Sequence, residues 1–330
     1  MSTFLGVDGG GSKTRFLLID DTGRTLAVHD EGSAYHPEIG LQALAAMLAR
    51  GVALVLARGG VRAQDLTYAF FGLPCHGEDR ALELQLDALP AAALPSGRFR
   101  CGNDMICGWA GALAGEYGIN VVAGTGSIAY GEYAGQSARA GGWGELFSDE
   151  GSAYWIAREG LRLFSRMADG RAPRSGLYEL IRKRFGLTED IELCAAVYGK
   201  ETIQRSQFAQ LSKLVAQAAL SGDSQARAVF NAAAGELADL VDAVRLRLQV
   251  PPAVELPVSC TGGLFELREL LMAPFGAVLA SRKGRYRLAP ARLTPEAGAA
   301  LYAARLSGMP LAGRAIEALS THGFTTAFST

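Results

Sequence analysis

The sequence has no run of one charge and no long uninterrupted apolar stretch. Lys plus Arg number 32 and Asp plus Glu number 33 among 330 residues, with no five like charges in a row. A nucleic-acid-binding stripe or a polybasic membrane patch is therefore not expected. The longest apolar region, residues 41–57, is interrupted by Gln42, Arg50 and Gly51, so it predicts a helix packed on a core and not a membrane span.

Cysteines are few and their spacing forms no recognisable site. There are five, an odd number, with no C-x-x-C pair: Cys75, Cys101, Cys107, Cys194 and Cys260. This pattern supports neither a disulfide framework nor a zinc site. No basic segment followed by an apolar one precedes Asp8, so we do not expect a secretory signal. We expect a cytoplasmic protein. With 49% hydrophobic residues, the chain is long enough for two domains that act on a small molecule.

The first organised feature is a strand meander that occurs twice. Residues 3–29 read as strand, glycine turn, strand, turn and strand, and residues 119–142 repeat that order about 115 residues later. The segment between them predicts helices at 40–58, 80–89 and 105–114 and strands at 67–72 and 98–101. We therefore predict an α/β protein with a small domain, 1–117 plus about 292–330, and a larger domain, 118–291.

The second half is mostly helical in pattern, which predicts helical insertions in the larger domain. Spacing of 3.6 residues predicts helices at 152–167, 176–185, 191–198, 204–220 and 225–249. A strand at 256–260 and helices at 265–271 and 295–305 complete the pattern. The tail after residue 306 has only weak apolar periodicity, and its role stays open.

Three glycine turns raise the question of phosphate binding. The first, VDGGGSKT at residues 7–14, misses the Walker pattern because Ser12 precedes Lys13 and a strand follows instead of a helix. A plain hairpin turn remains an alternative for this turn alone. The matched turn at 123–127 and a third at 260–263 favour a cradle in which bare backbone N–H groups meet phosphate oxygens.

Two carboxylates stand where phosphoryl transfer needs them. Asp8 ends the first strand beside the glycine turn, where it can hold Mg²⁺ near the phosphates, although a turn-capping Asp is the alternative. Asp104 stands where a strand gives way to a helix, and it is either an N-cap or the general base that takes a proton from a hydroxyl.

These motifs resemble a known family. VDGGGSKT, Asn103-Asp104, AGTGSIAYG at 123–131, GGWGELFSDEGSAYWIA at 141–157 and SCTGGL at 259–264 follow the order seen in N-acetylglucosamine kinases and bacterial hexosamine kinases of the BadF/BadG/BcrA/BcrD ATPase family. The resemblance extends to about residue 306. It implies two actin-like, ribonuclease H-like domains with a cleft between them, and transfer of the γ-phosphoryl group of ATP, with Mg²⁺, to the 6-hydroxyl of N-acetylglucosamine. Glucosamine is the alternative acceptor, and a homodimer is implied.

The resemblance also carries residue roles. Asp104 resembles the catalytic base and Asp8 the metal-associated carboxylate. The turns supply the expected ATP contacts: Gly10, Gly11, Ser12, Lys13, Thr14, Gly124, Thr125, Gly262 and Gly263. The expected sugar contacts are Tyr35, Gly126, Ser127, Gly142, Trp143, Asp149 and Ala153.

Some of these sugar contacts have support from their chemistry. Trp143 offers a flat face on which a sugar can stack, and Asp149 can accept from two hydroxyls. The alternatives are a core Trp and a helix cap at 148–150. Tyr35 stands where the family carries an Asn, which has a donor and an acceptor where Tyr has one hydroxyl, so the identity of the sugar stays open.

Two other functions are alternatives to the kinase. An ATP-driven activator of a dehydratase or reductase needs cysteines that ligate an iron–sulfur cluster. No cysteine of this chain lies in a Cys-Ala-Ala-Gly-Thr-Gly-like motif, because Val122 precedes the AGTGS turn. A non-catalytic sugar sensor usually carries a helix-turn-helix segment at its start, and none precedes residue 3. The sequence favours the sugar kinase.

Overall fold

The computed structural model describes residues 1–95, 97–199 and 203–323, with side chains through residue 320. The chain forms two compact units. Unit 1 combines Met1–Asn120 with Ala289–Thr330, and unit 2 is Val121–Leu288. Each unit contains a five-stranded sheet.

The sheet of unit 1 has the order β3-β2-β1-β4-β5. Its strands are β1 (Thr3–Gly9), β2 (Thr14–Asp20), β3 (Thr25–Glu31), β4 (Tyr68–Leu73) and β5 (Phe99–Asn103). The first three form the antiparallel meander, while β4 runs parallel to both β1 and β5. Because parallel strands end at the same edge, the carboxyl ends of β1 and β5, where Asp8 and Asp104 lie, share one edge of the sheet.

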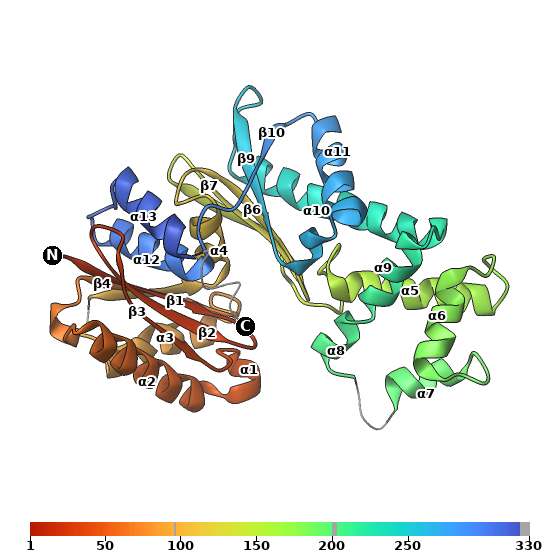
Figure 1. Ribbon diagram of the computed structural model, residues 1–330, viewed down its shortest axis with the longest axis horizontal. Helices are drawn as coiled ribbons and strands as arrows, with labels where there is room; N and C mark the ends of the chain where they lie inside the picture. The colour runs from red at the N-terminus through yellow and green to blue at the C-terminus, as the bar shows by residue number, and fades with distance from the viewer. Residues whose placement is uncertain (96, 200–202, 324–330) are drawn as a thin grey trace. The chain divides into compact units, whose positions relative to one another are not determined.

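Helices cover both faces of this sheet (Figure 1). The helical elements of unit 1 are α1 (His36–Ile39), α2 (Leu41–Gly59), η1 (Ala63–Asp65), α3 (Arg80–Ala88), η2 (Leu89–Ala92), α4 (Met105–Ala112), α12 (Pro295–Leu306) and α13 (Gly313–Gly323). Alternate residues of each strand face opposite layers. Leu5 and Val7 therefore join the core beneath α2, whereas Phe4 joins the core beneath α12.

The layer of unit 1 that contains α4 and α12 is packed closely because several of its residues are small. A Cβ added to Gly298 of α12 would lie 2.1 Å from the backbone N of Gly111 and 2.4 Å from the carbonyl O of Cys107, both on α4. Gly6 of β1 has the same constraint, because its Cβ would lie 2.2 Å from the backbone N of Ala300. Only glycine allows this approach. It brings α12 into close contact with both α4 and β1.

The sheet of unit 2 repeats the plan of the first. Its order is β10-β9-β6-β7-β8, which, read from the other edge, matches the order of unit 1 strand for strand. The strands are β6 (Gly118–Ala123), β7 (Ser127–Tyr133), β8 (Gln136–Gly141), β9 (Glu255–Thr261) and β10 (Arg285–Ala289). The predicted repeat of the meander is confirmed.

Helices account for most of the rest of unit 2. They are α5 (Ala153–Ala168), α6 (Gly176–Phe185), α7 (Glu192–Tyr198), α8 (Arg205–Ala209), α9 (Ser212–Leu220), α10 (Ser224–Arg247), η3 (Gly263–Glu266), η4 (Arg268–Met272) and α11 (Ala273–Ser281). Two predicted helices are wrong in detail. The segment 204–220 forms two helices, α8 and α9, and 265–271 forms a 3-10 turn and a π-helical turn that lead into α11.

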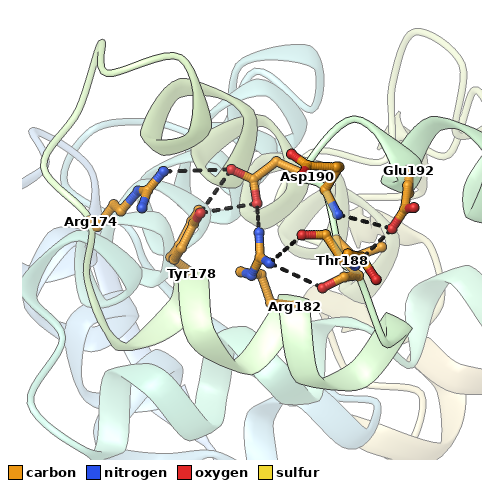
Figure 2. Close-up of polar contacts among 8 residues, drawn as sticks. Arg174, Tyr178, Arg182, Thr188, Asp190 and Glu192 are labelled. Carbon is orange, nitrogen blue, oxygen red and sulfur yellow. Dashed lines mark hydrogen bonds and ion pairs between the residues drawn. The ribbon is translucent and has the colours of Figure 1, made fainter.

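Polar contacts join α6 to α7 in unit 2, and Figure 2 shows them. The Tyr178 hydroxyl lies 2.8 and 3.0 Å from the two carboxylate oxygens of Asp190, which also pairs with the guanidinium of Arg182. Arg182 donates in addition to the carbonyl oxygens of Leu187 and Thr188 at 3.1 and 2.8 Å. A partly exposed carboxylate with several donors fixes the turn between two helices.

One helix in the described part of the chain, α2, is long and apolar enough to cross a membrane by length and composition alone. It lies against the sheet of unit 1, where Leu44, Leu48, Val52 and Val55 enter the core (Figure 1). The face carrying these residues is that of a core helix, as the sequence predicted.

Candidate active site

Asp8 lies at the carboxyl end of β1, deep among protein atoms but with part of its surface open. Burial, with further contributions from the carboxylates of Asp104 and Glu296, raises the pKa of Asp8 from 3.8 to about 8. Like charges close together in a low-dielectric setting favour the protonated form. A cation placed here would favour the charged form instead.

Asp104 follows β5 directly and is also half-buried. It makes no side-chain capping bond to α4, because that bond is supplied by Asn103, whose Oδ1 accepts from the N–H of Met105 at 3.1 Å. Burial raises the pKa of Asp104 to about 6, with Glu78 adding to the rise and nearby backbone N–H groups opposing it. A carboxyl with a pKa near neutrality suits general-base work.

The carboxylates of unit 1 fit a Mg²⁺ ion that is held mainly by other ligands. Among the described residues no group of three or more His, Cys, Asp or Glu side chains could enclose a metal ion. Glu296 pairs with Arg15 at 3.4 Å. Mg²⁺ usually binds one or two carboxylates together with waters and phosphate oxygens. Asp8, with its raised pKa, is the residue whose charged form such an ion would stabilise.

The first glycine turn, residues 10–13, closes the hairpin of β1 and β2. Gly10 donates its N–H to the carbonyl O of Lys13 at 2.9 Å, and its own carbonyl accepts from Ala34 at 2.9 Å. Gly11, Ser12 and Lys13 are exposed. Thr14 is fully buried, and its hydroxyl donates to the carbonyl of Gly32 at 2.8 Å. Thr14 therefore supports the turn from inside, and the three exposed residues present it to solvent.

Tyr35 precedes α1 in the same unit. Its N–H donates to the hydroxyl of Ser33 at 3.0 Å, and the side chain is half-buried. The neighbouring His36 is 9% exposed, and its Nδ1 has no hydrogen-bond partner among the described residues. The segment is thus ordered by local backbone contacts, while Tyr35 keeps part of its surface open.

The second glycine turn, residues 124–127, is seated on the start of α5 in unit 2. The N–H groups of Ala153 and Tyr154 donate to the carbonyls of Gly124 and Thr125 at 2.9 and 3.2 Å. The Ser127 hydroxyl donates to the carbonyl of Glu150 at 2.7 Å. The structure therefore brings together four of the predicted residues, Gly124, Thr125, Ser127 and Ala153.

Asp149 joins this group through its side chain. Its carboxylate accepts the N–H of Ser127 at 3.4 Å and pairs with Arg205 at 2.5 Å. Helix α5 is capped by Ser152 instead, whose hydroxyl accepts from Trp155 at 3.1 Å. The alternative in which Asp149 caps this helix is wrong. Asp149 has a φ of 58° and is 2% exposed, so a buried acid is held in an unusual backbone conformation beside the turn.

Trp143 is 64% exposed in the loop that leads to Asp149, so it is not a core residue of unit 2. The guanidinium of Arg139 lies 5.4 Å from its ring centroid. Gly142 has a φ of 69°, and a Cβ there would lie 2.7 Å from the side chain of Ile128. The glycine therefore lets the loop turn sharply, and Trp143 presents its ring to solvent.

The third glycine turn ends β9 and touches the start of the second. A Cβ on Gly262, which has a φ of 96°, would lie 2.4 Å from the carbonyl O of Ala123, whereas the Cβ of an alanine at 263 would meet open space. Beside this turn is an apolar cavity of about 510 Å³, lined by Cys260, Phe265, Arg268, Met272, Ala273, Gly276 and Leu288. Burial raises the pKa of Cys260 to about 12, so its thiol is neutral at physiological pH.

Several residues of these sites were missed in the sequence. Glu78 and Glu296 act on Asp104 and Asp8, and Glu145 and Arg205 surround Asp149. Glu78, Glu296 and Arg205 come from segments distant in the chain from the residues they act on, whereas Glu145 lies in the same 141–157 stretch as Asp149. The three distant residues could be identified only from the three-dimensional arrangement of the elements.

Comparison with known proteins gives the chain relatives over most of its length. The N-acetyl-D-glucosamine kinase of Dictyostelium discoideum is 28% identical over 309 residues, which cover 91% of this chain and 97% of that protein. An N-acetylmuramic acid/N-acetylglucosamine kinase of Clostridium acetobutylicum is 28% identical over 247 residues, covering 74% of this chain and 79% of that protein.

A solved structure gives the same likeness in three dimensions. The structure of a candidate N-acetylglucosamine kinase from Chromobacterium violaceum has a TM-score of 0.69 and 27% identity, covering 91% of this chain and 98% of that one. The predicted two-domain actin-like α/β fold is confirmed. The sequence profile of the BadF/BadG/BcrA/BcrD ATPase family matches residues 5–303, and the chain belongs to that family.

Proposed function

We propose that this ATPase-family chain is a hexosamine kinase that transfers the γ-phosphoryl group of ATP to the 6-hydroxyl of N-acetylglucosamine. The names of the relatives support the class of reaction. The observation that carries the proposal is Asp104, a half-buried carboxyl at the end of β5 with a pKa near 6 and no capping role. The chain offers in this residue the base that the reaction requires.

Asp104 acts on the acceptor hydroxyl. Its carboxylate accepts the hydroxyl proton as the oxygen forms its bond to the γ-phosphorus and the bond from that phosphorus to the β–γ bridging oxygen breaks. The proton remains on Asp104 and passes to solvent after the product leaves. Because phosphoryl transfer depends mainly on positioning and charge stabilisation, this proton transfer is one contribution among several.

ATP and Mg²⁺ are proposed to use the predicted turns. Mg²⁺, when bound, neutralises charge on the phosphates, and Asp8 is the carboxylate proposed to hold it, directly or through water. Gly10, Gly11, Ser12 and Lys13 of unit 1 and Gly124, Thr125, Gly262 and Gly263 of unit 2 are the proposed ATP contacts. The apolar cavity beside Gly262 is suited to a flat base such as adenine.

The proposed sugar contacts are Trp143, Asp149 and Tyr35. An exposed indole offers a stacking face, and the Asp149 carboxylate can accept hydrogen bonds from sugar hydroxyls. The alternative acceptor is glucosamine, because Tyr35 presents a single hydroxyl where the family has an amide. We also propose that the protein is cytoplasmic and that it forms a homodimer. Light scattering after gel filtration tests the dimer directly.

The experiment measures ADP release by purified protein with MgATP and one sugar at a time. The sugars are N-acetylglucosamine, glucosamine, N-acetylmannosamine and glucose, with a sugar-free control, and mass spectrometry identifies the product. Stimulation by N-acetylglucosamine with formation of its 6-phosphate supports the proposal. Stimulation by glucosamine alone supports the alternative. Turnover of ATP that responds to no sugar overturns both.

A further inference from the structure

Arg205 connects the helical insertion of unit 2 to the candidate sugar site. It is the first residue of α8, and its side chain reaches two acids of the loop at 142–152. The guanidinium Nε lies 2.9 Å from Oε2 of Glu145, and Nη2 lies 2.5 Å from Oδ2 of Asp149. Two charge-assisted contacts to different carboxylates hold the guanidinium plane in one orientation.

The same guanidinium stands over the second glycine turn. A Cβ on Gly126 would lie 2.7 Å from Nη2 of Arg205 and 2.8 Å from Oδ2 of Asp149. The turn, the acid and the arginine therefore meet at one point, although their residues are up to 79 positions apart in the sequence (205 − 126). A side chain at position 126 would push against the ion pair and shift it.

Packing, and not the ion pair alone, places Arg205. The ring of Phe208 on α8 lies 4.5 Å, centroid to centroid, from the ring of Tyr154 on α5. Phe208 belongs to a buried cluster with Ala157 and Leu211. Because α5 also carries the second glycine turn at its start, α8 and the turn share one support. The arginine is thus anchored to the element that supports the turn.

Asp149 has acceptor capacity beyond these contacts. A carboxylate offers about four lone-pair positions, and in the structure Oδ1 accepts from the N–H of Ser127 while Oδ2 accepts from Arg205. The remaining positions suit the donors of neighbouring sugar hydroxyls. Which way they point depends on the carboxylate plane, and Arg205 is the charged group that sets this plane.

We propose that Arg205 is a positioning residue for the sugar, acting through Asp149. The proposal rests on the proposed function and deepens it, because it names a determinant of amino-sugar binding in the helical insertion. Arg205 holds the Asp149 carboxylate in the orientation that receives two sugar hydroxyls, and Glu145 prevents the guanidinium from turning away. Its effect falls on sugar binding and not on the transfer step.

The main test is the variant Arg205→Ala, assayed by steady-state kinetics with N-acetylglucosamine and MgATP. Loss of a charge-assisted hydrogen bond predicts a rise in the sugar KM of about tenfold to a hundredfold. The KM for ATP and kcat stay within about threefold of the wild type. Arg205→Lys keeps the charge without the fork and recovers part of the loss. The matched control is Arg162→Ala, which removes an exposed arginine paired with Glu159 at 2.6 Å on α5.

A double variant separates positioning from a general structural role. In an Asp149→Ala background, removal of Arg205 changes sugar affinity by less than about twofold if Arg205 acts through Asp149. Calorimetric titration of sugar into ATP-free protein gives the same comparison without turnover. Independent, additive losses, or an unchanged sugar KM in Arg205→Ala, overturn the inference. If Arg205→Ala does not fold, Arg205→Lys decides, since an unchanged sugar KM there overturns it as well.

The wild-type protein keeps this test distinct from the test of function. If the wild type phosphorylates an amino sugar and Arg205→Ala does so with equal affinity for it, the role of Arg205 is rejected and the kinase stands. If the wild type neither binds nor phosphorylates any amino sugar, the proposed function itself is rejected, and the inference falls with it.

Discussion

Asn103, and not its neighbour Asp104, caps helix α4, because its side-chain oxygen accepts the N–H of Met105 at 3.1 Å. From the sequence alone, Asp104 was a candidate both for the helix cap and for the general base. Asn103 satisfies the helix end, and Asp104 presents a carboxyl at the edge of the sheet. The half-buried position of Asp104 raises its pKa to about 6. These contacts lead to the first two predictions.

Asp104→Asn tests the base directly. We expect kcat to fall by about 10²- to 10⁴-fold, because the amide cannot accept the hydroxyl proton, with little change in ATP affinity. Coupled measurement of ADP release and calorimetric titration of MgATP check the two parts. Asp65→Asn, which removes an exposed carboxylate paired with Arg62, is the matched control in the same unit. Activity of Asp104→Asn within about twofold of wild type excludes the role.

The pH profile tests the same carboxyl without a mutation. A base must be deprotonated, so kcat/KM for the sugar should rise with pH through about 6 and level off above it. Stopped assays at saturating MgATP between pH 5 and pH 8 give the profile. A rate constant that is flat from pH 5 to pH 7 would contradict the assignment.

The elements that define the sites could be predicted from the sequence because their signals are local. Glycine turns at strand ends and the acids beside them lie within a few consecutive residues, and each meander, at 3–29 and 119–142, is one continuous stretch. β10 was missed because Tyr286 and Leu288 alternate with arginines over only five residues, RYRLA, and none of these side chains is fully buried. The split of 204–220 into α8 and α9 has no Gly or Pro signal, and it follows from the packing of Phe208 and Leu211 on α5. Glu296 beside Asp8 and Arg205 beside Asp149 required the fold itself, because each lies far from its partner in the sequence.

The two adjacent glycines of the third turn provide a matched pair of variants. Gly262→Ala would place a Cβ 2.4 Å from the carbonyl O of Ala123 at a φ of 96°, whereas Gly263→Ala meets open space. We expect Gly262→Ala to lower the free energy of unfolding by about 1–3 kcal/mol or more and Gly263→Ala to change it by less than about 0.5 kcal/mol. Urea unfolding measures both. Equal effects of the two variants would show that the close approach to β6 is absent.

The contacts of Asp190 predict how unit 2 responds to acid. Although burial opposes the change, hydrogen bonds from Tyr178 and Arg182 lower the pKa of Asp190 below its usual value. A depressed carboxyl pKa contributes stability above the unfolded-state pKa and loses it as pH falls through the folded one. Asp190→Asn should therefore increase amide exchange in α6 and α7 at pH 7, and the difference from wild type should shrink at acid pH. Asp169→Asn, in the exposed pair with Arg171, is the control.

Asp8→Asn separates the stability of unit 1 from its response to metal. Burial, Asp104 and Glu296 raise the pKa of Asp8 to about 8, above its ordinary value of 3.8. Between these two values the folded protein binds the proton more tightly than the unfolded chain, so the contribution of Asp8 to stability falls as pH rises. Replacement by the neutral amide should therefore raise the melting temperature by a few degrees at pH 8 and by less at pH 5.

The same variant should lose its response to Mg²⁺. In the wild type at pH 8, we expect Mg²⁺ with ADP to stabilise the charged carboxylate and to raise the melting temperature beyond the effect of ADP alone, whereas Asp8→Asn offers no charge for the ion to stabilise. Scanning fluorimetry with and without MgCl₂ at both pH values measures the two effects together. A variant that is less stable than wild type at pH 8 would show that the charged Asp8 does not destabilise the fold. A variant that keeps the full Mg²⁺ shift would show that Asp8 is not the metal-associated carboxylate. If stability rises and the Mg²⁺ shift disappears, the charged Asp8 at the end of β1 destabilises the fold and is required for the response to Mg²⁺.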